Sequence, residues 1–248
     1  GCHTAPGGAA MAGGRVINTP FGAVVSANLT PDAQAGLGRW TPAAFRRALQ
    51  QGRSADGRAL LPACPYPNFS LVEDRDADDL FAWLQSLPAQ AQAVPPHQLR
   101  WPYGLPAALT VWRAVNFEPA RLPPPPANAP PDWARGAYLV GGLGHCSACH
   151  GAHDGWGATG GAFDFRGGEV PAQGWLAPAL TDPAAAGAQA WTVDDVTALL
   201  QQGRNRHASA SGLMARVVAH STRHLTADDA RAIVSELDSP WALIRDAL

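Results

Sequence analysis

Two segments of the chain carry apolar residues at helical spacing, and each segment follows a threonine. Phe45 and Leu49 come after Thr41, and a similar set comes after Thr192. The members of that second set are Val193, Val196, Leu199 and Leu200. Threonine is a favoured N-cap, and this spacing places the apolar side chains on one face, so both segments are predicted to be helices. A further helix is predicted to begin at 225–229, where acidic residues follow a threonine.

These helices belong to an internal repeat. A tryptophan precedes each helix, and each helix closes with the sequence Leu-Gln-Gln-Gly-Arg. The distance is 151 residues both from Trp40 to Trp191 and from Arg53 to Arg204. Such a constant offset indicates two copies of one structural unit.

Other landmarks extend the repeat. Each copy begins with a Cys-His pair, continues through a turn and ends with a closing helix. The pairs lie at 2–3 and 149–150, and the turns lie at 28–32 and 179–183. The closing helices are predicted to end at 87–88 and 239–240. Between the copies, four consecutive prolines favour polyproline II and a semi-rigid spacer. We therefore predict a first domain at 1–122, a linker at 123–133 and a second domain at 134–248, which opens with a helix at 133–140.

No segment alternates apolar and polar residues convincingly, so the predicted fold is all-α. The 26 glycines and 23 prolines indicate modest helices joined by long loops. A net charge of −2 gives no basic surface, and no nucleic-acid partner is expected. The most apolar stretch, 103–117, is interrupted by Pro106 and Arg113 and is predicted to be a short helix packing on the protein or on a partner. Because the sequence opens at Gly1-Cys2-His3 without a leader, we expect a processed or incompletely represented chain.

The placement of the cysteines carries the most specific chemical signal. Cys146, Cys149 and His150 form Cys-x-x-Cys-His, the attachment sequence for c-type haem. The two thiols bind the haem vinyl groups, and the histidine is the proximal iron ligand. A zinc site would need further ligands at metal-site spacing, and a redox dithiol would need a βαβ setting. Neither is visible in the sequence.

A carrier haem also needs a sixth ligand, and the chain has two methionines. Met214 is expected in a loop over the haem face opposite His150, where methionine raises the reduction potential relative to histidine. An ordinary core side chain is the alternative. Met11 follows His3 closely and is expected to serve in packing.

The first copy is less complete. Cys2 and His3 match the end of the attachment motif, and three interpretations are open: the sequence starts inside the motif, the haem has one thioether, or no haem is bound. We favour the first, because residues 4–8 continue as a haem loop does.

Cys64 takes the place of a sixth ligand in the first copy. It lies eleven residues after Arg53, while Met214 lies ten after Arg204. A thiolate ligand would give a haem of much lower potential. The alternative is a buried free cysteine.

The remaining histidines and tryptophans are assigned less specific roles. His145 is expected to pack in the haem pocket, and four others are expected at the surface or in hydrogen bonds: His153, His207, His220 and His224. Three tryptophans are expected in the core rather than at haem edges: Trp101, Trp156 and Trp175.

With these motifs, the chain resembles the multihaem cytochrome c subunits of membrane-associated bacterial dehydrogenases for alcohols, gluconate or sorbitol, and aldehydes. The matching segments cover nearly the whole chain: 2–8, 19–22, 28–32, 62–66, 144–150 and 211–215. The resemblance implies tandem class I-like cytochrome c domains, with His3 and His150 as proximal ligands and Met214 as a distal ligand. Family members often have methionine where this chain has Cys64. A third haem domain, common in the family, is absent or not represented.

The expected function is electron transfer by a non-catalytic subunit with two covalent haems c. A dehydrogenase catalytic subunit is the expected donor, and a quinone, a cytochrome or an oxidase is the expected acceptor. The expected location is the periplasm or the periplasmic face of the inner membrane, with membrane association through a partner or a missing segment. One alternative is a dihaem enzyme, such as a thiosulfate-oxidising one with a His/Cys haem at Cys64, although no acid–base pair is evident beside Cys64 and only Asp74 and Asp76 follow it. A second alternative is a haem-based sensor, against which Met214 argues.

Overall fold

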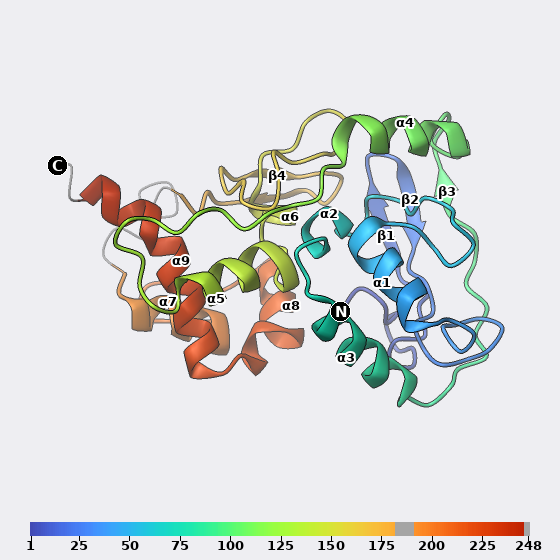
Figure 1. The fold of residues 1–248 in the computed structure, drawn as a ribbon, viewed down its shortest axis with the longest axis horizontal. Helices are drawn as coiled ribbons and strands as arrows, with labels where there is room; N and C mark the ends of the chain where they lie inside the picture. Colours follow the sequence, from blue (N-terminus) through green and yellow to red (C-terminus); the bar gives the residue numbers. More distant parts are fainter. Residues whose placement is uncertain (182–190, 246–248) are drawn as a thin grey trace.

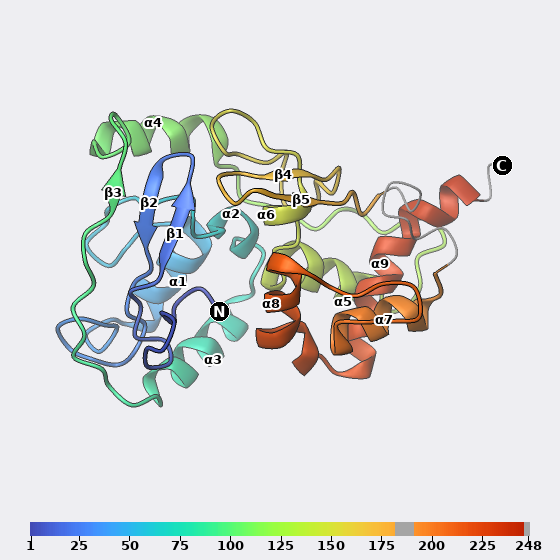
Figure 2. The ribbon, with the colours of Figure 1, turned by 180° about the vertical axis from the view of Figure 1, so that it is seen from behind.

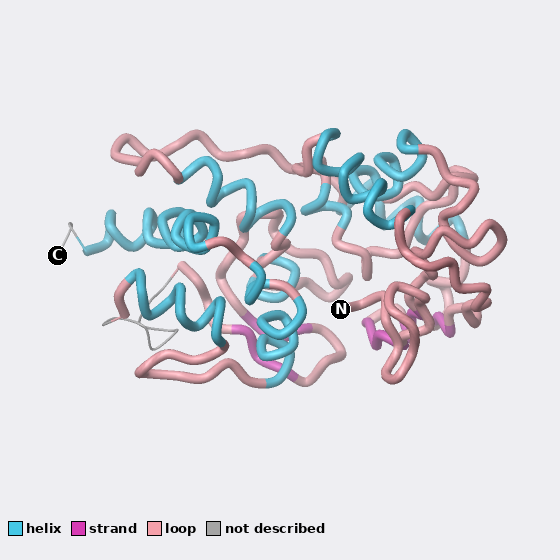
Figure 3. Tube along the Cα trace, turned by 90° about the horizontal axis from the view of Figure 1, so that it is seen from below, coloured by secondary structure: helices cyan, strands magenta, loops and turns pink. Residues whose placement is uncertain are grey.

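The computed structural model describes the backbone of residues 1–181 and 191–245. Side chains are described for residues 1–181 and 191–237. The chain up to helix α4 forms one half of the molecule, and the chain from helix α5 onward forms the other (Figure 1). In the view from behind and in the view from below, the chain begins at the junction between these halves (Figures 2 and 3).

The first half combines a small sheet with four helices. Antiparallel strands lie in the order β1 (Val16–Thr19), β2 (Gly22–Val25) and β3 (Gln98–Leu99). The helices are α1 (Pro42–Gln51), α2 (Tyr66–Phe69), α3 (Asp74–Gln85) and α4 (Pro106–Asn116). The helix expected within 103–117 is therefore confirmed as α4.

The second half is mainly helical with one short hairpin. Its helices are α5 (Trp133–Tyr138), α6 (Ser147–His150), α7 (Val193–Gln202), α8 (Gly212–His220) and α9 (Ala227–Arg245). A π-helical turn, η1 (Leu139–Leu143), extends α5, and a 3-10 turn, η2 (Thr222–His224), precedes α9. The hairpin pairs β4 (Gly168–Val170) with β5 (Trp175–Ala177). The second copy of the predicted turn, at 179–183, lies partly outside the described residues.

The hairpins correct the all-α prediction, although helices dominate the fold. In the first hairpin, Val16 pairs with Val25 and Ile17 with Val24 around a two-residue turn. β-Branched residues favour strands, but four-residue strands are too short to show a clear alternation in sequence. The closing end predicted at 239–240 is also wrong, because α9 continues to Arg245.

The predicted caps of α1 and α7 are confirmed. The Thr41 hydroxyl accepts a hydrogen bond from the Ala44 amide, and Thr192 forms a reciprocal capping box with Asp195. At the other end, Gly52 and Gly203 adopt left-handed conformations with φ of 60° and 74°. Glycine adopts this conformation without strain, so the Gly-Arg sequence ends both helices at matching positions.

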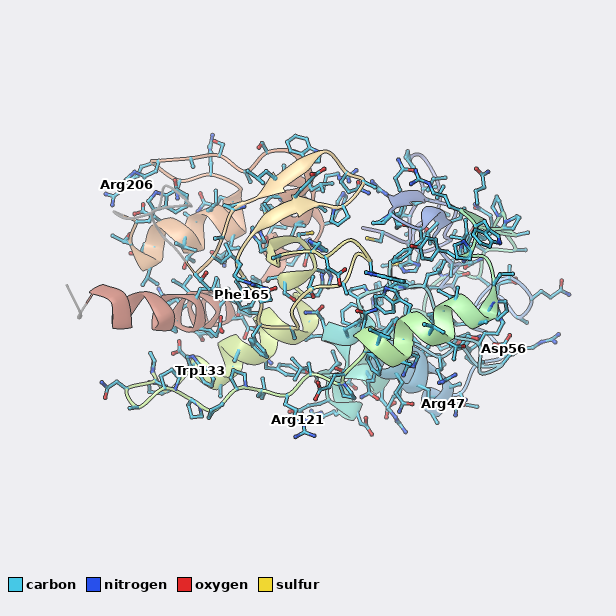
Figure 4. The ribbon with its side chains drawn as sticks, turned by 90° about the horizontal axis from the view of Figure 1, so that it is seen from above. Arg47, Asp56, Arg121, Trp133, Phe165 and Arg206 are labelled. Carbon is cyan, nitrogen blue, oxygen red and sulfur yellow. The ribbon has the colours of Figure 1, made fainter. Side chains whose placement is uncertain are left out.

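Each half has its own hydrophobic cluster. The first contains Leu37, Phe45, Phe81 and Leu84, with Met11 packed against it as expected. The second contains Leu139, Val140, Phe165 and Ile233; Figure 4 shows Phe165 inside this half, whereas Arg121 and Arg206 point outward. Helices α5 and α9 cross closely where a Cβ at Gly136 would overlap the Ala232 carbonyl.

An extended segment between α4 and α5 runs along the second half before α5 begins at Trp133 (Figures 1 and 4). It contains the four consecutive prolines, and the helix expected immediately after it is confirmed. Within the described ranges, no helix combines the length and apolarity needed to cross a bilayer.

Candidate functional site: two histidine centres

The attachment motif of the second half forms a single helical turn. The His150 amide donates to the Cys146 carbonyl at 2.8 Å, and the Cys149 amide donates to the same oxygen at 3.2 Å. Residues three and four positions apart lie on one helical face, so both thiols and the imidazole project from the same side of α6. None of the four cysteines forms a disulfide.

The His150 ring is oriented by a backbone carbonyl. Its Nδ1 lies 2.8 Å from the Pro178 oxygen, and the Gly167 amide donates to the His150 carbonyl at 2.7 Å. A carbonyl only accepts, so Nδ1 carries the proton and Nε2 keeps a free lone pair. Burial lowers the pKa of His150, which favours the neutral imidazole. A neutral ring held in this tautomer is ready to bind a metal through Nε2.

His3 repeats this arrangement in the first half. Its Nδ1 lies 2.8 Å from the Ala27 oxygen, and the Gly13 amide donates to the His3 carbonyl at 2.9 Å. Burial lowers the pKa of His3 as well. Ala27 and Pro178 are 151 residues apart, which is the offset of the repeat. The sequence repeat is thus matched by two histidine centres with the same hydrogen bonds.

Gly13 and Gly167 make room for these carbonyls. Their φ angles are 75° and 73°, and a Cβ at either position would lie within 2.6 Å of backbone atoms of the carbonyl-bearing loop. Neither these glycines nor the carbonyls of Ala27 and Pro178 were predicted from the sequence. The signal was present in the matched turns, which directly follow both carbonyls.

The structure aligns Cys64 with Met214. The Leu60 amide donates a hydrogen bond to the Gly52 carbonyl at 2.8 Å, and the Ala210 amide donates one to the Gly203 carbonyl at 2.7 Å. Cys64 and Met214 each lie four residues after the donating residue, so they occupy matching positions.

The backbone differs at these two positions. Cys64 lies in a turn just before α2, whereas Met214 lies in the first turn of α8. The prediction that Met214 sits in a loop is therefore wrong. A Cβ at Gly212 would overlap the ring of Trp175, so this ring covers the start of α8. A helix start fixes the position of the Met214 backbone more firmly than a loop would.

Burial raises the pKa of three of the four cysteines. The pKa of Cys64 is raised to about 12, with a smaller contribution from Cys2. The pKa of Cys149 is raised as well, again with a smaller contribution from Cys2. Burial raises the pKa of Cys146 to about 12, and the largest further contribution comes from Glu236.

The other histidines mostly have the expected surroundings. His145 packs against Phe69 with ring centroids 5.3 Å apart, and His207 stacks on Trp191 at 5.8 Å. His220 and His224 are exposed, and His153 is half-buried.

The three tryptophans were wrongly predicted to be in the core. Trp101 is 85%, Trp156 56% and Trp175 46% exposed. All three lie in turns or in a short strand, where few neighbouring side chains are available to cover a large ring. Periodicity cannot reveal this in irregular segments.

Asp74 and Asp76 have partners away from Cys64. Asp74 accepts a hydrogen bond from Gln50, and Asp76 accepts one from Tyr138. Both begin helix α3, where the helix dipole favours acidic residues. They therefore do not form an acid–base pair with Cys64.

Comparison with curated proteins finds relatives along nearly the whole chain. It is 34% identical to a dihaem c-type cytochrome of Cereibacter sphaeroides, over 95% of this chain and 79% of that protein. The chain belongs to this family of c-type cytochromes. It is also 37% identical to the cytochrome c subunit of gluconate 2-dehydrogenase from Pantoea cypripedii and 40% identical to a subunit of nicotinate dehydrogenase from Pseudomonas putida. These alignments cover 96% and 99% of this chain.

This c-type cytochrome spans about a fifth of the nicotinate dehydrogenase subunit, at 21%, and about half of the gluconate dehydrogenase subunit, at 56%. No protein-family model matches the chain. Family membership establishes covalently attached haem c as its cofactor, with two haems expected. The donor set fits this cofactor, because both histidines are held with Nδ1 on a backbone carbonyl, which leaves Nε2 for iron.

Proposed function

We propose that the protein is a dihaem electron carrier with one haem in each half, corresponding to domains at 1–122 and 134–248. The observation that carries this proposal is the pair of equivalent histidines, each with Nδ1 held 2.8 Å from a backbone carbonyl. A single centre would not require the second copy of this arrangement. Bound in these two sites, haem iron would supply one-electron chemistry.

In this proposal, the side chains hold each haem and saturate its iron. Cys146 and Cys149 form thioethers in the second half, and Cys2 forms one in the first. His150 and Met214 would bind the iron in the second half, and His3 and Cys64 would bind it in the first. The matching positions of Cys64 and Met214 support this assignment. Two protein ligands on each iron exclude water and small molecules and limit reorganisation during electron transfer.

The proposed electron donor is the catalytic subunit of a dehydrogenase, and the acceptor is a quinone, another cytochrome or an oxidase. The names of the relatives support the donor, since they include cytochrome subunits of gluconate, alcohol and fructose dehydrogenases. The proposed location is the periplasm or the periplasmic face of the inner membrane. Association with the membrane would come through a partner or through a segment outside this sequence.

A carrier and a catalytic dihaem enzyme differ in their reaction with small molecules. Ferrous holoprotein should not bind carbon monoxide, should be reoxidised by a soluble quinone and should not be reduced by thiosulfate. Carbon monoxide binding at the native protein's haems would contradict a carrier with saturated irons. Haem reduction that depends on thiosulfate would instead support catalysis at the Cys64 centre.

A further inference from the structure

Asn68 connects the two halves through buried hydrogen bonds. It lies in α2, four residues after Cys64, and is 4% exposed. Its Nδ2 donates to the Ser147 hydroxyl at 2.8 Å and to the Gly141 carbonyl at 2.9 Å. Ser147 is fully buried and lies between the two cysteines of the attachment motif. One amide of the first half therefore contacts the segment that holds the haem of the second half.

Neighbouring contacts reinforce this junction. The Tyr138 hydroxyl at the end of α5 donates to Asp76 at 2.6 Å and accepts from the Glu73 amide at 3.2 Å. Phe69, next to Asn68, packs edge-on against His145, the residue before the motif. The start of α3 and the end of α2 are thus docked on the α5–α6 region.

Domains in one chain usually move relative to each other unless their interface is extensive. The buried hydrogen bonds of Asn68 oppose such motion, because breaking them leaves unpaired acceptors in a low-dielectric interior.

We propose that Asn68 is a positioning residue for electron transfer between the haems: its bonds to Ser147 and Gly141 fix the second attachment motif relative to the first centre. This inference rests on the proposed dihaem function. The amide is suited to the role because one NH2 group satisfies two acceptors from consecutive segments, η1 and α6. Leucine has a similar volume but no donor, so Asn68→Leu would leave both acceptors unpaired.

The test uses holoprotein with its haem content verified. One electron is delivered by a photochemical reductant, and the rate of its redistribution between the two haems is followed optically. The iron–iron dipolar coupling of the ferric protein is measured by pulsed electron paramagnetic resonance. The variants are Asn68→Leu and the milder Ser147→Ala, which retains the Gly141 bond. Asn205→Ala is the control, because among the described residues its side chain bonds to Asp195, His207 and Ala208, all of the second half.

We expect Asn68→Leu to slow redistribution several-fold and to broaden or shift the dipolar coupling, with a smaller change in Ser147→Ala. Asn205→Ala should lose stability but keep the wild-type rate and coupling. Wild-type rate and coupling in both junction variants would overturn the role of Asn68 while leaving the dihaem function intact. Absence of any redistribution in the wild-type holoprotein would instead overturn the proposed function. If Asn68→Leu does not fold, Ser147→Ala decides the question by the same two measurements.

Discussion

The Nδ1 atom of His150 lies 2.8 Å from the Pro178 carbonyl, and this bond depends on the close approach of Gly167 to the carbonyl-bearing loop. The same geometry holds His3 against Ala27 beside Gly13. The orientation of each imidazole is therefore set by backbone atoms rather than by a second side chain. Substitutions that displace those backbone atoms should affect one haem at a time.

Gly167→Ala should destabilise the second centre selectively. Its φ of 73° costs a non-glycine residue about 1–2 kcal/mol, and the added Cβ would also lie 2.5 Å from the Ala179 nitrogen. Gly174→Ala is the matched control, since φ is 66° there but a Cβ would meet open space. Denaturant unfolding and a spectroelectrochemical titration would show whether only Gly167→Ala shifts the potential of the second haem. Equal effects of both substitutions would argue against carbonyl positioning.

Met214→Ala should convert the second haem into one that binds exogenous ligands. Loss of the thioether should lower its potential by a sizeable part of the roughly 0.8 V range that axial ligands span. The near-infrared methionine-to-iron band should disappear, and carbon monoxide should bind the ferrous protein. Met11→Leu should leave all three properties unchanged, because Met11 packs against the core of the first half. Retention of the band in Met214→Ala would exclude Met214 as the ligand.

Cys64→Met should raise the potential of the first haem, because a neutral thioether stabilises the ferric state less than a thiolate does. Magnetic circular dichroism of the ferric protein should show a thiolate signature in the wild type and lose it in the variant. If Cys64 only packs in its turn, the wild-type spectrum will lack that signature, and Cys64→Ala will leave the potential of the first haem unchanged.

Glu236 should make stability depend on pH. Burial raises the pKa of this carboxyl to about 7, and its Oε2 has no hydrogen-bond partner. The folded state therefore holds the proton more tightly than the unfolded state, whose pKa is about 4.3. The contribution of protonated Glu236 to the free energy of unfolding is fully present below the unfolded pKa. This contribution is lost as pH rises through about 7, by on the order of 3 kcal/mol. Glu236→Gln should flatten the pH dependence of the unfolding free energy, and an unchanged slope would contradict this origin.

Features that depend on local signals could be predicted from the sequence. The caps Thr41 and Thr192, the glycine ends of α1 and α7 and the start of α5 at Trp133 are set by residues within one or two turns, and all are confirmed. The repeat alone also aligned Cys64 with Met214 to within one position.

The features that escaped sequence analysis depend on long-range contacts. Asn68 and Ser147 are separated by 79 residues, and neither belongs to a pattern. The carbonyls of Ala27 and Pro178 are backbone groups that no residue type specifies. The strands are short, and the exposed tryptophans lie in turns or in one of these strands. In such segments hydrophobicity alone does not indicate which side chains are covered.

A haem count tests most directly whether the protein carries one haem in each half, as we propose. A pyridine haemochrome assay on purified holoprotein, combined with a protein determination, gives the number of c-type haems per chain. Two haems are predicted, one held by His150 and one by His3. One haem would contradict the claim and would make the first half a partner domain that keeps the histidine geometry without the cofactor.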